Sequence, residues 1–291
     1  MTRRLEAEIV VQAQCELAEG PVWDASRSLL RWVDILPGHV HALDPATGAH
    51  TWFDAGEPVG TVGLTRGGGL VLALADAFHL ADHDGQRLRR LGEFSADGSV
   101  LRFNDGKPDP WGNFWAGTCA IDEQAGPPGS LYRLRPDGSV GEIVSDVGLS
   151  NGLDWSDDRR LFYFADSASG GVDAFATDPE TGTLDARRRF VTVGGIPDGL
   201  TLDAEGCVWV AIWGSSELRR YTPAGALDTV VSLPVTQVTS AAFGGSDLST
   251  LYITTARENF TPSDLREQPH AGDIFACTPD VTGRPPFLFA H

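Results

Sequence analysis

The chain has 291 residues, of which 42% are hydrophobic, and it contains 34 glycines and 18 prolines. This apolar content supports a folded core and excludes a disordered chain, while the glycine- and proline-rich turns favour short strands over long helices. The formal net charge of −18 argues against nucleic acid or an anionic membrane as a partner, because an acidic surface is repelled by both. No apolar run approaches the ~18 residues that a transmembrane helix needs.

The first ten residues combine two arginines with two glutamates and have neither an apolar segment nor a small-residue cleavage site. They do not resemble a secretory signal, so we expect a cytoplasmic protein. The four cysteines lie far apart, without a Cys-x-x-Cys pair, at positions 15, 119, 207 and 277. This spacing argues against a structural zinc site and predicts free buried thiols in a reducing compartment.

A unit of two short strands joined by a polar, glycine-containing turn recurs six times along the chain. The copies begin near Glu19, Thr61, Asn104, Asn151, Asp198 and Ser240, at spacings of 42, 43, 47, 47 and 42 residues. A third strand follows, such as 129–134, then a hairpin turn such as the Pro-Asp-Gly at 136–138, and then a fourth strand.

Four antiparallel strands every 42–47 residues predict an all-β chain folded as a six-bladed β-propeller, with residues 1–291 forming one domain. An N-terminal strand around residues 7–12 is left over. We expect it to pair beside residues 286–290 in the last blade, so that the N- and C-terminal strands close the ring and remove an open edge.

The six positions that begin the repeats are all polar. In a propeller the innermost strand of each blade runs along the central channel, so equivalent positions form a ring around it. Two carboxylates and two amides that converge there indicate a cation, because otherwise the carboxylates would repel each other. Oxygen donors suit Ca²⁺, Mg²⁺ or Mn²⁺, with zinc or iron as alternatives. The other interpretation, that Asn-Gly and Asp-Gly pairs cap tight turns, explains each position singly but not all six together.

Two residues before each ring position lies a row that is aliphatic except in one repeat, where it holds Arg102. We interpret this arginine as a substrate contact that directs its donors into the channel. The alternative is an ion pair with a nearby acid such as Asp122.

These motifs resemble the SMP-30/gluconolactonase (regucalcin-like) family of bacterial sugar lactonases over essentially the full length. The matching stretches are LAEGPVW at 17–23, RFNDGK at 102–107, WAGT at 115–118, SNGLDWS at 150–156 and IPDG at 196–199. The resemblance implies a six-bladed propeller with one divalent metal ion in the channel, Ca²⁺ or Zn²⁺ foremost, with Mg²⁺, Mn²⁺ or Fe²⁺ as alternatives. It implies Glu19, Asn151 and Asp198 as metal ligands.

The resemblance also implies substrate contacts by Arg102 and Asn104. A family acid on the lid-side loop, usually glutamate, falls on Asp122, whose side chain is one methylene shorter. Lys107 belongs to the motif, and we expect it to be structural. The rim loops at 122–129 and 258–272 are expected to select the sugar.

The activity that follows is hydrolysis of a sugar lactone to the aldonic acid by a monomeric enzyme. Asp198 is the predicted general base, with Glu19 or a hydroxide from bound water as the alternatives. No Gly-x-Ser-x-Gly elbow is present, and no histidine occupies a ring position. Two rival functions remain, a metal-dependent esterase or phosphotriesterase propeller and a non-catalytic calcium-binding regulatory propeller.

Overall fold

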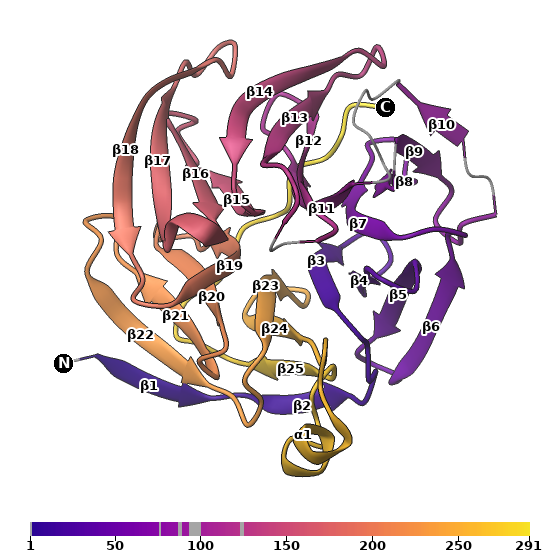
Figure 1. The fold of residues 1–291 in the computed structure, drawn as a ribbon, viewed down its shortest axis with the longest axis vertical. Helices are drawn as coiled ribbons and strands as arrows, with labels where there is room; N and C mark the ends of the chain where they lie inside the picture. The colour runs from indigo at the N-terminus through magenta and orange to yellow at the C-terminus, as the bar shows by residue number, and fades with distance from the viewer. Residues whose placement is uncertain (1, 76, 87–88, 93–99, 123–124) are drawn as a thin grey trace.

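The computed structural model describes residues 2–75, 77–86, 89–92, 100–122 and 125–291. Six β-sheets stand like blades around a central channel (Figure 1), which confirms the predicted six-bladed propeller. The chain fills the blades in order, and the first strand of each blade lies innermost, beside the first strands of its neighbours.

Each blade contains at least four strands, which follow one another from the channel outward. Blade 1 is β3 (Ala18–Asp24), β4 (Leu29–Asp34), β5 (His39–Asp44) and β6 (Ala49–Asp54), and blade 2 is β7 (Val59–Leu64), β8 (Leu70–Leu74), β9 (Phe78–Ala81) and β10 (Arg89–Leu91). Blade 3 is β11 (Leu101–Pro108), β12 (Phe114–Ala120), β13 (Gly129–Leu134) and β14 (Val140–Val147), and blade 4 is β15 (Ser150–Trp155), β16 (Leu161–Asp166), β17 (Gly171–Thr177) and β18 (Leu184–Thr192). Blade 5 is β19 (Ile196–Leu202), β20 (Val208–Trp213), β21 (Glu217–Tyr221) and β22 (Leu227–Ser232), and blade 6 is β23 (Val238–Gly244), β24 (Thr250–Thr255), β25 (Ile274–Cys277) and β2 (Glu8–Val11).

The N-terminal segment closes the ring. The strand β2 pairs antiparallel with β25 and completes blade 6, as predicted, while β1 (Arg3–Glu6) pairs parallel with β22 and extends blade 5. The short helix α1 (Pro262–Glu267) lies in the connection between β24 and β25. No helix of the described ranges is long and apolar enough to cross a membrane.

The predicted pairing of residues 286–290 beside the N-terminal strand is wrong. Phe289 instead forms a parallel bridge with Thr65 of blade 2, and the Ala290 N–H donates to Gly112 O at 2.9 Å in blade 3. After β25 the chain crosses the ring and ends near these blades (Figure 1). The outer edge of β25 is already occupied by β2, and prolines at 279, 285 and 286 cannot donate to a ladder.

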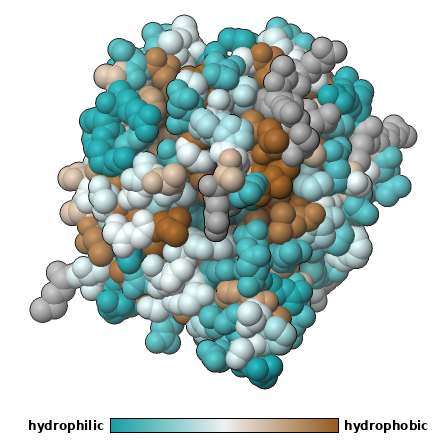
Figure 2. Space-filling view, viewed as in Figure 1, coloured by the Kyte–Doolittle hydropathy of each residue, from teal (hydrophilic) through white to brown (hydrophobic). Residues whose placement is uncertain are grey.

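Six hydrophobic clusters fill the six spaces between neighbouring blades. The cluster between blades 3 and 4 contains Trp115, Trp155 and Phe162, all fully buried. Aromatic side chains suit these spaces because the blades diverge as they leave the channel. The surface in Figure 2 is largely polar, with apolar patches near the centre of this face.

A buried aspartate clasps the turn between the first two strands of a blade. Asp203 accepts hydrogen bonds from the backbone N–H of Glu205 and Cys207, from Trp209 Nε1 at 2.9 Å and from Arg220 Nε at 2.7 Å. An aspartate at 109 makes the equivalent contacts in blade 3, including one from the Trp115 indole at 2.7 Å. In each of these two blades, one aspartate therefore hydrogen-bonds both to the turn and to the core tryptophan.

Asp203→Ala is expected to lower the free energy of unfolding by about 1–3 kcal/mol, because the buried Trp209 N–H loses its acceptor. Arg220 loses its buried carboxylate partner and keeps Glu205 and Asp228. Urea unfolding followed by tryptophan fluorescence measures the change. Asp247→Ala, in the corresponding exposed turn of blade 6, is the matched control and should have a much smaller effect. Equal losses for the two variants would contradict the assigned role.

Candidate functional site

All six inner strands are irregular at the predicted ring. The register with the second strand shifts at Glu19/Val22, Val59/Thr61, Phe103/Gly106, Ser150/Leu153, Pro197/Leu200 and Val238/Ser240. A bulge leaves backbone unpaired and redirects the local side chain, which is why bulges recur beside functional sites. Here the six shifts fall at equivalent positions of the repeat.

The glycine after a ring residue allows the inner strands to approach each other closely. A Cβ atom on Gly152 would lie 2.3 Å from Leu200 N, and one on Gly199 would lie 2.1 Å from Ser240 Oγ. These two Asn-Gly and Asp-Gly pairs lie within β15 and β19, not in hairpin turns. These glycines are needed because a side chain would collide with the neighbouring inner strand. Their place inside strands disfavours the interpretation that the Asn-Gly and Asp-Gly pairs cap turns.

A cavity of about 610 Å³ opens at one end of the channel. Its walls include Glu19, Asn104, Asn151 and Asp198, each no more than 5% exposed, together with Arg102. Five of the six predicted site residues therefore share one cavity.

The other two ring members do not face this cavity. Thr61 is fully buried and its hydroxyl donates to Gly106 O at 2.9 Å. Ser240 lines a second cavity farther along the inner strands. Four of the six ring residues therefore line the cavity, and the other two contact different parts of the protein.

Asp122 does not line the cavity. It lies two residues beyond the end of β12, is exposed, and its Oδ1 accepts a hydrogen bond from the Ala125 N–H at 3.3 Å. Residues 123 and 124 of this predicted rim loop lie outside the described residues. The substrate contact expected of Asp122 therefore stays a prediction.

A chain of hydrogen bonds sets the orientation of the amides. Arg102 Nη1 donates to Asn104 Oδ1 at 2.6 Å, and Asn104 Nδ2 donates to Ser150 O at 2.9 Å and to Asn151 Oδ1 at 3.3 Å. Asn151 Nδ2 donates to Ser167 Oγ at 2.9 Å. With its nitrogen bonded to Ser167, Asn151 keeps an oxygen lone pair that a hard cation could use, beside the one that accepts from Asn104.

The electrostatics of the cavity also fit a cation. Burial, the charges of Asp198 and Asp105, and a hydrogen bond shared with Asp198 raise the pKa of Glu19 well above its usual range, although the Gly20 N–H opposes this. Two carboxylates in contact and shielded from water repel each other, and a divalent cation relieves that repulsion. Glu19, Asp198 and the Asn151 oxygen form an all-oxygen donor set, so the residues fit a hard divalent ion.

The sequence interpretation missed several residues of this cavity, including Ser167, Trp213 and Gln237. Gln237 is 9% exposed, its Nε2 donates to Glu258 O at 3.0 Å, and its Oε1 has no hydrogen-bond partner. Ser167 directly follows a second strand, Trp213 ends one and Gln237 precedes an inner strand. The repeat carries no polar signature at these places. Only the ring position itself recurs clearly enough to be found from sequence.

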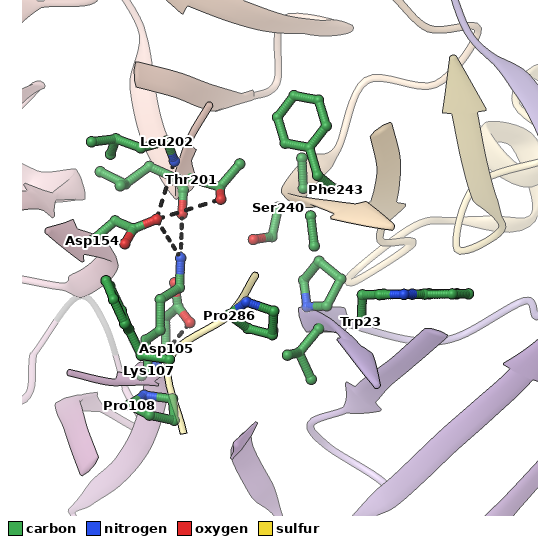
Figure 3. Close-up of a pocket in the computed structure, with 18 of the residues that line it drawn as sticks. Trp23, Asp105, Lys107, Pro108, Asp154, Thr201, Leu202, Ser240, Phe243 and Pro286 are labelled. Carbon is green, nitrogen blue, oxygen red and sulfur yellow. Dashed lines mark hydrogen bonds and ion pairs between the residues drawn. The ribbon is translucent and has the colours of Figure 1, made fainter. Parts of the chain in front are cut away.

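A smaller cavity of about 60 Å³ lies farther along the channel (Figure 3). Lys107 Nζ contacts Asp154 Oδ2 at 3.2 Å and donates to Leu200 O at 3.1 Å, and Arg284 Nη2 contacts Asp154 Oδ1 at 2.6 Å. Burial alone would raise the pKa of Asp154, but Arg284 and Lys107 lower it below its usual value. Lys107 thus ties blades 3, 4 and 5 together, in agreement with a structural role.

The fold and the cavity at its axis place the chain among the six-bladed β-propellers with a polar cavity in the central channel. The model of the SMP-30/Gluconolactonase/LRE-like family matches residues 17–257, and the chain belongs to this family.

Several relatives span the whole chain. The chain is 38% identical to regucalcin from Oryctolagus cuniculus over 297 residues, which cover 98% of this chain and 99% of the relative. It is 37% identical to 6-deoxy-6-sulfogluconolactonase from Pseudomonas putida over 284 residues, 97% of each chain. A solved structure of regucalcin from Agrobacterium tumefaciens, described as a calcium-binding protein, superposes with a TM-score of 0.94 at 27% identity, covering 100% of this chain and 99% of that one.

The buried acid Asp105 generates a pH-dependent stability in the metal-free protein. Burial raises its pKa to about 6, Lys107 and the Gly106 N–H oppose the rise, and Asp154 adds to it. The folded state keeps this proton up to about pH 6, whereas an unfolded aspartate releases it near pH ~4. The free energy of unfolding should therefore fall as the pH rises from about 4 to about 6.

Asp105→Asn should reduce this slope and raise the free energy of unfolding at pH 7 by about 2–3 kcal/mol, since the amide still accepts the Gly106 N–H without a buried charge. Urea unfolding in a chelator across this pH range tests it. Asp137→Asn is the control. Asp137 lies in an exposed turn and its pKa is lowered, so this substitution should change the free energy of unfolding only below pH ~4. An unchanged slope in Asp105→Asn would refute the assignment.

Proposed function

We propose that the chain hydrolyses an aldonolactone to the aldonic acid, with one divalent cation held by Glu19, Asn151 and Asp198. The observation that carries the proposal is the convergence of two buried carboxylates and an oriented amide oxygen on a cavity that Arg102 also lines. The relative from Pseudomonas putida is named a sulfogluconolactonase, which supports a sugar lactone as the substrate class.

A bound divalent cation supplies Lewis acidity toward a carbonyl oxygen and lowers the pKa of nearby water. Calcium is the ion we favour, because the donors are all oxygen and the Agrobacterium relative is described as calcium-binding. Zinc is the alternative. Asn104 and Ser167 hold the Asn151 amide in an orientation that leaves one oxygen lone pair for the ion.

Asp198 acts as the general base. Its carboxylate takes a proton from the attacking water as the water oxygen bonds to the lactone carbonyl carbon. The carbon–oxygen bond of the ring then breaks, the ring oxygen receives a proton, and the open aldonic acid forms. Glu19 is the alternative base, since metal ligation would lower the basicity of Asp198.

Arg102 and Asn104 position the substrate. The Arg102 guanidinium is half-buried and donates to the Asn104 oxygen through Nη1. Its other N–H groups can donate to sugar hydroxyls after a small rotation of the side chain. Its planar fork suits neighbouring hydroxyl oxygens on one ring. Binding of this kind places the carbonyl near the carboxylates and reduces the entropic part of the barrier.

A calcium-binding role without turnover is the second candidate function, since the Agrobacterium relative, which superposes with a TM-score of 0.94, is described as a calcium-binding protein. Such a role requires the carboxylates but not Arg102. Turnover of aldonolactones, followed with a pH indicator, separates the two functions.

Asp198→Asn is expected to reduce kcat/KM for an aldonolactone at least ~10²-fold, because it removes the proposed base and one anionic ligand. Chelation with EDTA should abolish turnover, and adding back calcium or zinc should restore it. Asp247→Asn, at an exposed turn, is the matched control. Full activity in metal-free, chelated protein would overturn the mechanism.

Arg102→Ala should raise KM for aldonolactones about 10–100-fold and change kcat less, as expected for loss of charge-assisted contacts that bind ground state and transition state alike. Arg102→Lys should recover only part of this loss, because an ammonium lacks the planar fork. Steady-state kinetics over a panel of aldonolactones provides the measurement. An unchanged KM in Arg102→Ala across the panel would show that Arg102 does not contact substrate.

A further inference from the structure

A second group of potential metal ligands lies in blade 1, outside the channel. It consists of Cys15 in the segment before β3, Asp34 at the end of β4 and His41 in β5. Their exposed fractions are 2%, 6% and 4%, and the sulfur, carboxylate and imidazole donor atoms lie within 4.8 Å of one another. Three different donor types meet in the interior at one point.

We propose that Cys15, Asp34 and His41 form a binding site for a thiophilic divalent transition metal ion, with Zn²⁺ as the expected ion. A thiolate, an imidazole and a carboxylate are ligands that zinc accepts together, and three protein ligands leave the fourth tetrahedral position to water. This site is independent of the function proposed for the channel.

The distance between the two softest donors suits an ion between them. Cys15 Sγ and His41 Nε2 lie 3.9 Å apart. Zinc bonds of ~2.3 Å to sulfur and ~2.0–2.1 Å to nitrogen span this separation at a wide tetrahedral angle. The same separation is long for a direct hydrogen bond.

The surroundings of His41 match those of a ligating histidine. His41 Nδ1 lies 2.9 Å from His50 Nε2 and His41 Nε2 lies 3.9 Å from Cys15 Sγ. In the tautomer with its proton on Nδ1, His41 donates to His50 and directs the Nε2 lone pair toward Cys15. Metal-bound histidines typically donate their other N–H in this way. Burial, with the His50 and His39 charges adding to it, lowers the pKa of His41 to about 3, so the ring is neutral, as a ligand must be.

Cys15 and Asp34 are also prepared for ligation. The Trp32 indole donates to Cys15 Sγ at 3.5 Å and stacks on the His41 ring at 5.0 Å. Asp34 accepts the N–H groups of Glu16 and Leu17 at 3.0 and 2.8 Å, which orients its carboxylate and leaves lone pairs available. Burial and the nearby Asp34 raise the pKa of the Cys15 thiol to about 12, so ion binding must release its proton and should strengthen as the pH rises.

The two sites would select different ions. The channel donors are all oxygen, whereas this cluster has a sulfur and a nitrogen, which favour zinc over calcium. Asp34 also fixes the backbone immediately before β3, the strand that carries Glu19. An ion at this cluster would therefore stabilise the segment that leads into the channel site.

The test uses Co²⁺ as the probe on the full chain after removal of metal with EDTA. To exclude the channel, all proteins carry Asp198→Asn. The background protein is expected to bind one Co²⁺ with a thiolate-to-cobalt charge-transfer band in the near ultraviolet, and Zn²⁺ should displace the Co²⁺ and raise the Tm. Cys15→Ser should abolish the band, while Cys277→Ser, which alters a partly buried thiol in blade 6, should keep it.

His41→Asn retains the thiol and keeps the proposal testable if Cys15→Ser fails to fold. It should weaken Co²⁺ binding at least ~10-fold, the scale seen when metal sites lose a supporting contact. Absence of the band in the folded background protein, or its persistence in Cys15→Ser, would overturn the proposed metal site. The three side chains would then serve only as hydrogen-bonded residues of the core. Because lactone turnover is not a readout, neither result bears on the activity of the channel.

Discussion

The chemistry proposed for this propeller depends on two carboxylates, Glu19 and Asp198, that are buried in contact at the axis of the ring. Each comes from a different blade, so the packing of blades 1 and 5 around the channel holds them together against their repulsion. A third acid, Asp105, adds to the local negative charge. Two buried carboxylates that repel each other lower the stability of the metal-free protein. A divalent cation bound between them would remove this repulsion and stabilise the fold, so the same residues account for both the instability and the proposed metal binding.

The inner strands make this arrangement possible. A regular antiparallel strand would alternate its side chains and direct only some of them to the axis, but a bulge in every blade turns the backbone at an equivalent position of the repeat. The glycines at 152 and 199 then allow neighbouring strands to approach without a Cβ atom between them. Lys107 and Arg284 balance the charge of Asp154 farther along the channel, so the acidic character is concentrated at the other end.

Different blades contribute different chemistry to one repeated position. Blades 1 and 5 provide anions, blades 3 and 4 provide amides, and Thr61 and Ser240 turn to other partners. The single departure from the aliphatic row, Arg102, lies next to one of the amides and bonds to it. The repeat thus supplies a rigid frame, and function arises from the positions at which the copies differ.

The amino-acid sequence by itself determined the number of blades and identified five of the residues that line the main cavity, because turn chemistry and strand length repeat at a nearly constant spacing and the ring position is polar in each copy. Only the tertiary structure decided which ring members converge, because that depends on bulges and on contacts between strands more than 40 residues apart, such as Asn104 with Asn151. The same holds for Ser167, for the C-terminal segment that runs to blades 2 and 3, and for the meeting of Cys15, Asp34 and His41. These groups share no local sequence pattern. Strand pairing within a blade brings together Ser167 with Asn151 and Asp34 with His41, and the path of the chain across the ring brings the C-terminal segment to blades 2 and 3.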